Sequence, residues 1–132
     1  SVRNRLTLEN EDKGFFSVQH ILLFHQYLID TYDVAIPICY DNLHDVCNNT
    51  CDNDVETNMN LCLETWPNDV EPVFHWSEGK EDKMRSHRDY YTDNFFPPMA
   101  HRSIKWECEV KAKDYAICQL LEQHEAENLL VV

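Results

Sequence analysis

The chain has 132 residues, of which 43% are apolar, and its 24 acidic side chains outnumber the 11 basic ones to leave a formal charge of −13. This length predicts one small domain over residues 1–132 with a single modest core. The acidic charge repels phosphate backbones and anionic lipid headgroups, so we expect no nucleic-acid partner. The apolar runs fall far short of the roughly 20 residues that a membrane span requires.

The first half of the chain is predicted to be rich in helix. Residues 5–9 alternate in polarity and predict a short strand, and residues 17–32 repeat apolar side chains at helical spacing. Residues 34–38 are β-branched but contain a proline, which favours an extended connection. Residues 42–65 again follow helical spacing and predict a second helix, which Pro67 ends.

The second half mixes strand and helix signals. Residues 70–76 favour a strand, and the charged segment 81–96 predicts a helix that a Pro-Pro pair stops. Residues 104–113 alternate strictly and predict a strand, which residues 115–123 extend into a β-hairpin. The competing interpretation makes residues 104–127 one helix. The predicted fold class is therefore α+β, with all-α helical hairpins as the alternative.

The cysteine content predicts a fold stapled by disulfides, because an even count in a small chain is typical of an oxidising compartment. Cys47 and Cys51 lie on one predicted helical face, which favours bonds to other segments. The pairing stays open, although a hairpin would set Cys108 opposite Cys118. No C-x2-C pair occurs, so we expect no metal site. The six candidates for disulfide bonds are Cys39, Cys47, Cys51, Cys62, Cys108 and Cys118.

The segment from His44 to Cys47, followed by Thr50-Cys51 and Cys62-Leu63, resembles the catalytic helix of secreted phospholipases A2. The resemblance implies that His44, next to Asp45, is the base that activates water. The glycine-rich calcium loop of that family has no counterpart before this segment, where Gly14 is the one glycine available.

The segment from Glu107-Cys108 to Cys118-Gln119-Leu120 resembles one half of the twin C-x9-C hairpins of the mitochondrial intermembrane space. That resemblance implies a helical accessory subunit with bridges formed by oxidation and no catalytic site. The other half departs from the pattern, because ten residues separate Cys51 from Cys62.

The order of elements around Phe74-His75-Trp76, Gly79 and His101 is similar to the cone-shaped fold of nuclear transport factor 2 and its polyketide-cyclase relatives. That resemblance implies a pocket in which a histidine and an aspartate perform acid-base chemistry. His75 and His101 are the candidate residues for it.

The leading hypothesis from these patterns is a secreted or otherwise extracytosolic protein that binds a protein or a small ligand without catalysis or cofactor. The three resemblances remain as alternatives, with the mitochondrial intermembrane space as the alternative location. Asn48 begins a glycosylation sequon, which is compatible with secretion. Aromatic side chains that could anchor a partner cluster at Tyr90, Tyr91, Phe95 and Phe96.

Overall fold

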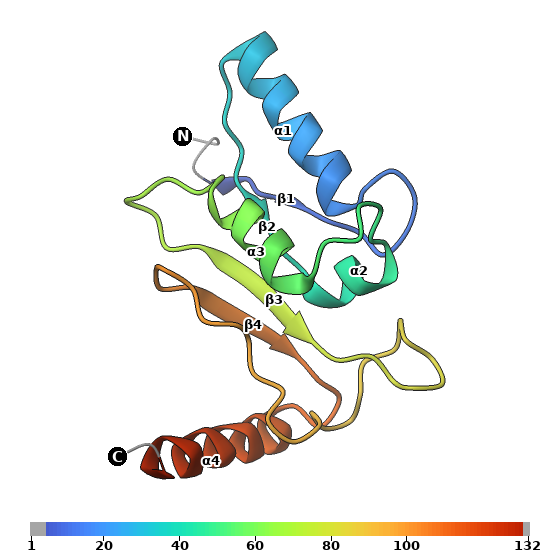
Figure 1. Ribbon diagram of the computed structural model, residues 1–132, viewed down its shortest axis with the longest axis vertical. Coiled ribbons are helices and arrows are strands. Elements are labelled where there is room, and N and C mark those ends of the chain that lie inside the picture. Colours follow the sequence, from blue (N-terminus) through green and yellow to red (C-terminus); the bar gives the residue numbers. More distant parts are fainter. Residues whose placement is uncertain (1–4, 131–132) are drawn as a thin grey trace.

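The computed structural model describes residues 5–130, and its helices and short parallel strands form a mixed α and β fold (Figure 1). Among the described residues, no helix has both the length and the apolar character needed to cross a membrane. In chain order, the elements are β1 (Leu8–Glu9), α1 (Val18–Tyr32), β2 (Ile38–Cys39), α2 (Asn42–Cys47), α3 (Val55–Leu63), β3 (Val73–Ser77), β4 (Lys105–Glu109) and α4 (Asp114–Leu130).

The four strands run parallel, in the order β1-β2-β3-β4. β1 pairs with β2, and β3 pairs with β4 over five residues, with His75 opposite Glu107. A parallel bridge between Asp41 and His75, with the amide of His75 donating to the carbonyl of Tyr40 at 2.8 Å, joins the two pairs. All four carboxyl ends therefore lie at one edge, where polar residues from distant parts of the sequence meet.

The two faces of this sheet differ in chemistry because successive side chains on a strand point to opposite sides. One face is apolar and packs against α1 and α3, with Ile38, Tyr40 and Phe74 fully buried. Its aromatic rings form edge-on contacts from Tyr40 to Phe74 and from Phe74 to Trp106. The opposite face carries the residues of the other parity, which include Glu9, Asp41, His75 and Glu107.

The helix predicted over residues 17–32 is confirmed as α1, whose N-cap is Ser17. The helix predicted over residues 42–65 is divided into α2 and α3. The intervening segment is rich in Asn and Asp, whose side chains favour turns and caps over helix interiors. Asp52 adopts a positive φ there, and Asp54 caps α3 by accepting from the amide of Thr57.

The β-hairpin predicted for the C-terminal part is wrong. The strand signal of residues 104–113 is confirmed as β4, but β4 pairs in parallel with β3, and residues 115–123 belong to α4. Lys113 turns the chain with a positive φ before that helix. The all-α alternative is also wrong, although it placed a helix correctly over the last segment. Residues 81–96 form turns and irregular structure instead of the predicted helix.

The disulfide staple predicted from Cys39, Cys47, Cys51, Cys62, Cys108 and Cys118 is not present, because all six are free thiols. They belong to separate elements: β2, α2, the following loop, α3, β4 and α4. Cys62 is fully buried in the core, and burial raises the pKa of its thiol, which keeps it protonated and unreactive. The even cysteine count therefore does not reflect cross-linking, and hydrophobic packing holds this fold together.

Candidate metal centre

A row of acidic and histidine side chains crosses the polar face of the sheet, at the carboxyl ends of β1 and β2 and in the middle of β3 and β4. Glu9 ends β1, Asp41 follows β2, His75 lies in β3 and Glu107 lies in β4. Within residues 5–130, no Lys or Arg forms an ion pair with these three carboxylates; their charged partners are histidines. Three carboxylates held together without a fixed positive charge favour the binding of a cation.

His75 lies at the centre of the row, and carboxylates face both nitrogens of its ring. Its Nδ1 lies 3.1 Å from Glu9 Oε1 and 3.6 Å from Asp41 Oδ2, and its Nε2 lies 3.1 Å from Glu107 Oε2. Contacts with Asp41, then with Cys39 and Glu9, raise the pKa of His75 well above its usual value. The ring is thus held by groups that accept hydrogen bonds, an environment that suits an imidazolium or a ring that binds a metal ion.

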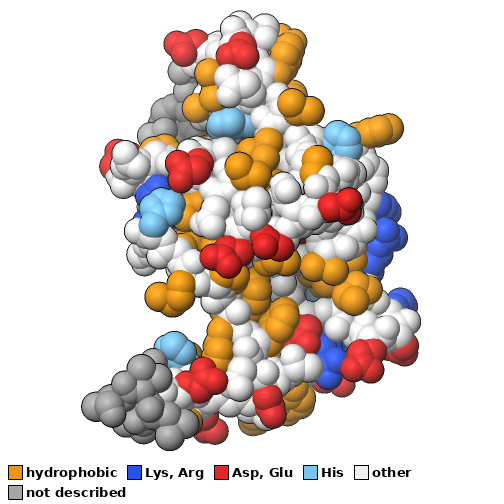
Figure 2. Space-filling model, in the orientation of Figure 1, with side chains coloured by type: hydrophobic (Ala, Val, Ile, Leu, Met, Phe, Trp, Pro, Cys, Tyr) orange, Lys and Arg blue, Asp and Glu red, His pale blue; other side chains and the backbone are white. Residues whose placement is uncertain are grey.

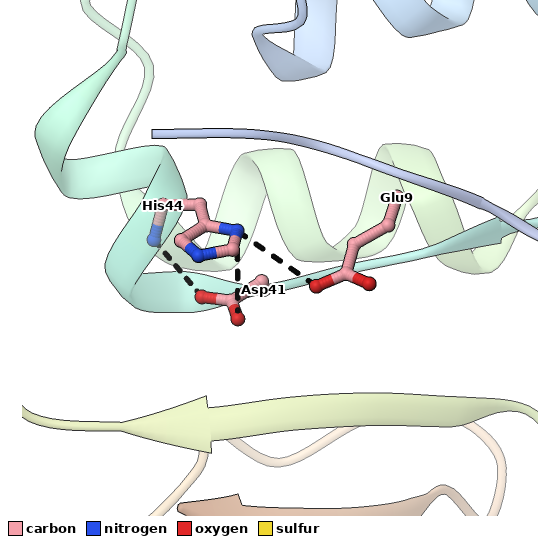
Figure 3. A group of neighbouring side chains, drawn as sticks. All are labelled: Glu9, Asp41 and His44. Atoms are coloured by element: carbon pink, nitrogen blue, oxygen red, sulfur yellow. Dashed lines mark hydrogen bonds and ion pairs between the residues drawn. The ribbon is translucent and has the colours of Figure 1, made fainter. Parts of the chain in front are cut away.

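Asp41 is both a buried carboxylate of the row and the N-cap of α2 (Figure 3). Its Oδ1 accepts from the amide of His44 at 2.9 Å, and its side chain is only 5% exposed. Burial alone would raise the pKa of Asp41, but hydrogen bonds from His75 and from the amide of His44 outweigh it and lower that pKa. Asp41 therefore stays ionised at the centre of the site.

His44 joins the same group from the first turn of α2. Its Nδ1 lies 2.8 Å from the carbonyl oxygen of Asn10, which can only accept, so Nδ1 donates the hydrogen bond. A backbone hydrogen bond of this kind is the usual way in which a metal-binding histidine is oriented. Ligand atoms of Glu9, Asp41 and His44 lie within 4.8 Å of one another, close enough to bind one metal ion (Figure 3).

Two buried asparagines position these residues by extending the strand pairing beyond the backbone ladder. Asn10 donates to the carbonyl of Asp41 at 2.9 Å and accepts from its amide at 2.8 Å. Asn42 makes the same reciprocal pair with Ser77, at 2.8 Å in both directions. Each side-chain amide thus acts like the backbone of an added strand residue. The carboxyl ends of β1, β2 and β3 are tied together where the row lies.

We expect Asn10→Ala to destabilise the fold and to weaken the site, because it leaves the buried amide of Asp41 without a partner, while the carbonyl of Asp41 keeps its hydrogen bond from the amide of Asp45 at 3.1 Å. The cost of one such group is about 1–3 kcal/mol. Thermal denaturation and Mn²⁺ titration would measure the two effects. Asn68→Ala, in an exposed turn, is the matched control and should change neither; an Asn10→Ala protein with normal Mn²⁺ affinity would contradict the positioning role.

The other sequence-predicted catalytic candidates lie outside the row. Asp45 is 1% exposed and accepts hydrogen bonds from Tyr40 Oη at 2.8 Å and from Asn58 Nδ2 at 2.9 Å. Burial raises the pKa of Asp45, although these two hydrogen bonds oppose the shift. Its contacts join β2, α2 and α3. His101 is exposed, lies before the amino end of β4, and has Glu64 at 3.9 Å as its charged neighbour.

The predicted aromatic interface is largely part of a second core cluster. Tyr91 is 6% exposed and donates from its hydroxyl to the carbonyl of Trp76 at 2.7 Å, while Phe95 stacks on the Trp76 ring. Phe96 packs against the same cluster, and Tyr90 is exposed. The side chain of Asn48, the sequon residue, donates to the carbonyls of Glu11 and Gly14.

The sequence analysis identified His44 and His75 but missed Glu9, Asp41, Asn10 and Glu107. Glu9 and Asp41 lie at or beside the carboxyl end of a strand and Glu107 lies in the middle of β4, each next to an apolar residue of the opposite face. An acidic residue or histidine recurring at the end of successive strands is the signal that could have found them. It becomes readable only once the strands are known to be parallel, since only then do those ends meet.

Comparison with protein families and curated proteins gives consistent matches. The family model described as "UV-endonuclease UvdE" matches residues 1–131. The chain is 31% identical over 130 residues to the UV DNA damage endonuclease of Bacillus velezensis, covering 92% of this chain and 38% of that protein. The enzyme of the same name from Bacillus pumilus is 29% identical, with the same coverage. The chain thus spans well under half the length of the curated relatives it matches.

A solved structure has the same fold. The crystal structure of SacUVDE superposes with a TM-score of 0.73 at 23% sequence identity, covering 95% of this chain and 41% of that one. This similarity supports the mixed arrangement of helices and parallel strands described above.

These matches contradict four predictions made from the sequence. A secreted or mitochondrial binding protein is wrong as function and as location, because the related proteins are UV DNA damage endonucleases. The resemblances to phospholipase A2, to C-x9-C proteins and to the nuclear transport factor 2 fold fail with it. Secretion and disulfide bonds have no support. The exclusion of a nucleic-acid partner is also wrong, since the relatives are named for action on DNA.

Proposed function

This chain belongs to the UV-endonuclease UvdE family, and on that premise we propose that its carboxylate and histidine row binds divalent metal for the cleavage of a phosphodiester bond in UV-damaged DNA. Two observations support the proposal. The relatives are named UV DNA damage endonucleases, and the side chains that could bind a metal lie close together, namely Glu9, Asp41, His75 and Glu107. The prediction of one domain over residues 1–132 remains a prediction beside it.

The observation that carries the proposal is the setting of His75. Carboxylates face its ring on both sides, at 3.1 Å from each nitrogen. Mixed carboxylate and imidazole ligands suit divalent ions such as Mn²⁺ or Zn²⁺. Glu9 and Asp41 would hold the ion together with His75 and His44, and Glu107, which faces the other nitrogen of the His75 ring, would orient that ring.

A divalent metal, when bound, lowers the pKa of a water molecule and neutralises charge on a phosphate oxygen. The protein's own residues supply orientation. Asn10 and Asn42 hold the strand ends in register, so that the carboxylates keep their spacing.

The test is nicking of supercoiled plasmid with and without prior UV irradiation, in Mn²⁺ or in EDTA. We expect nicked product only from irradiated plasmid in the presence of metal. Mn²⁺ binding is measured in parallel by electron paramagnetic resonance, which reports the site without requiring turnover. A protein that binds no Mn²⁺, or that nicks equally well in EDTA, would contradict a metal-dependent endonuclease.

A further inference from the structure

The basic residues of this acidic chain are concentrated at the edge of the sheet that carries the site. The loop after β3 (residues 78–89) and the turn after β4 (residues 110–114) contain six of the 11 basic residues but only five of the 24 acidic ones. Figure 2 shows most of the blue side chains on the side toward which the β3 and β4 arrows point in Figure 1. The remaining chain has 19 acidic and five basic side chains, so an approaching polyanion meets less repulsion at this region than the net charge implies.

Backbone hydrogen bonds hold these two segments together. The amide of Lys111 donates to the carbonyl of Arg88 at 3.0 Å, and that of Ala112 donates to Asp89 at 2.9 Å. Within the loop, Lys80 donates from its amide to Ser86, and Gly79 forms an antiparallel bridge with His87. A side chain at Gly79 would collide with the backbone of Met84, so the close turn requires glycine there. The loop is thus a defined support for its charges.

Lys80 and Lys111 bring two positive charges into contact on this support. Lys80 lowers the pKa of Lys111, first through direct side-chain contact and then through charge repulsion. The nearest carboxylate to Lys80 belongs to Asp89, at 4.0 Å, and that side chain is 68% exposed. Because Asp89 is distant and solvated, its carboxylate does little to reduce the repulsion between the two lysines. An anion with two oxygens would relieve the repulsion.

An open groove of about 450 Å³ lies on the Lys80 side of the pair, and Lys111 lines a separate groove with His87 and Glu109. Lys80, Arg88 and the exposed ring of Tyr90 line it, together with Glu81, Asp82 and Asp89. The three carboxylates of the groove repel an anion, so an anion can bind only near the lysine. The groove therefore suits a single phosphate of an extended nucleic-acid backbone. A surface that binds many phosphates would need fewer carboxylates.

We propose that Lys80 and Lys111 together bind one backbone phosphate of the DNA substrate and thereby position the strand across the carboxylate row. The inference rests on the proposed function and names the contact through which that site holds its substrate. β3 and β4 carry His75 and Glu107, and the two lysines follow the same strands at their carboxyl ends. The phosphate contact and the site therefore share one rigid support.

The test is fluorescence anisotropy of labelled duplexes, undamaged and UV-irradiated, bound in EDTA over a range of salt concentrations. We expect the double variant Lys80→Gln/Lys111→Gln to bind both duplexes several-fold more weakly and to reduce the salt slope by about 1, the loss of one phosphate contact. Its Mn²⁺ affinity should be unchanged. Lys80→Arg/Lys111→Arg should keep the slope.

Lys105→Gln is the matched control, because Lys105 begins β4 at the opposite end from the site; it should leave affinity and slope unchanged. Equal slopes in the double variant and the unsubstituted protein would overturn the inference and leave metal-dependent nicking untouched. Failure of the unsubstituted protein to bind either duplex at low salt would also overturn it. Measurement of Mn²⁺ binding by Asp41→Asn, in which we expect binding to be lost, tests the proposed function without involving the lysines.

Discussion

Replacement of Asp41 by Asn is expected to abolish metal-dependent nicking, with a loss of more than about 100-fold, because changes to groups that merely support a metal ligand already cost 10- to 100-fold. The substitution removes the negative charge that faces His75 at 3.6 Å. It keeps the fold, since Asn caps a helix as well as Asp does and can still accept from the amide of His44. Mn²⁺ affinity and nicking of irradiated plasmid are the measurements.

Asp54→Asn provides a closely matched control. Asp54 is the N-cap of α3 and accepts from the amide of Thr57 at 2.8 Å, in the same way that Asp41 caps α2. The same change of chemistry at the same kind of position should therefore leave Mn²⁺ affinity and nicking unaltered. If Asp41→Asn and Asp54→Asn lost activity equally, the loss would reflect helix capping, and the metal site would have to be placed elsewhere.

Much of the local structure was predictable from the periodicity of apolar residues along the sequence alone. The 3.6-residue repeat located α1, and the alternation around Trp106 located β4. Strands were also predicted near β1 and β3 and an extended connection at residues 34–38, where β2 begins, with helical segments between these three regions. That order, with a helical connection between strands roughly 30 residues apart, is typical of parallel βαβ units. The predicted α+β fold, with a helix-rich first half and a C-terminal β-hairpin, considered each strand separately and did not use this order of elements.

The cysteines and the net charge misled for different physical reasons. An even cysteine count predicts cross-links only where pairs approach each other, and here Cys51, Cys108 and Cys118 are exposed thiols on separate elements. Net charge sums over the whole surface, whereas DNA responds to local potential. Four basic residues lie in the loop after β3, beyond the carboxyl end of that strand. Much of the acidic excess lies elsewhere, partly in the row that we propose to bind metal.

The row itself was beyond the reach of sequence reasoning because its members come together only through parallel pairing. Glu9 and Asp41 are brought side by side by the β1–β2 register and by the Asn10 side chain. His75 reaches Asp41 through a single bridge between β2 and β3. Because the carboxyl ends of parallel strands lie at the same edge of a sheet, acidic residues that are far apart in the sequence come together in one site.

Metal binding should release a proton from His75, so that the apparent affinity for Mn²⁺ rises with pH. Contacts with Asp41, Cys39 and Glu9 raise the pKa of His75 in the folded, metal-free protein. A raised pKa means that the imidazolium stabilises the metal-free fold fully below the ordinary value of about 6.5 and loses this effect only as pH rises through the raised value. Between about pH 6 and 8 the ring therefore keeps its proton, whereas a metal ligand must be neutral.

Displacement of one proton predicts an increase in Mn²⁺ affinity of about tenfold per pH unit in that range. Isothermal titration calorimetry in buffers of different ionisation enthalpy measures the proton directly. Asp41 should contribute none, because its lowered pKa keeps it ionised throughout. His75→Gln should remove the proton release together with most of the affinity, whereas His101→Gln, at the exposed opposite end of β4, should retain both. Mn²⁺ binding that is independent of pH would show that His75 remains protonated and lies outside the metal's ligands.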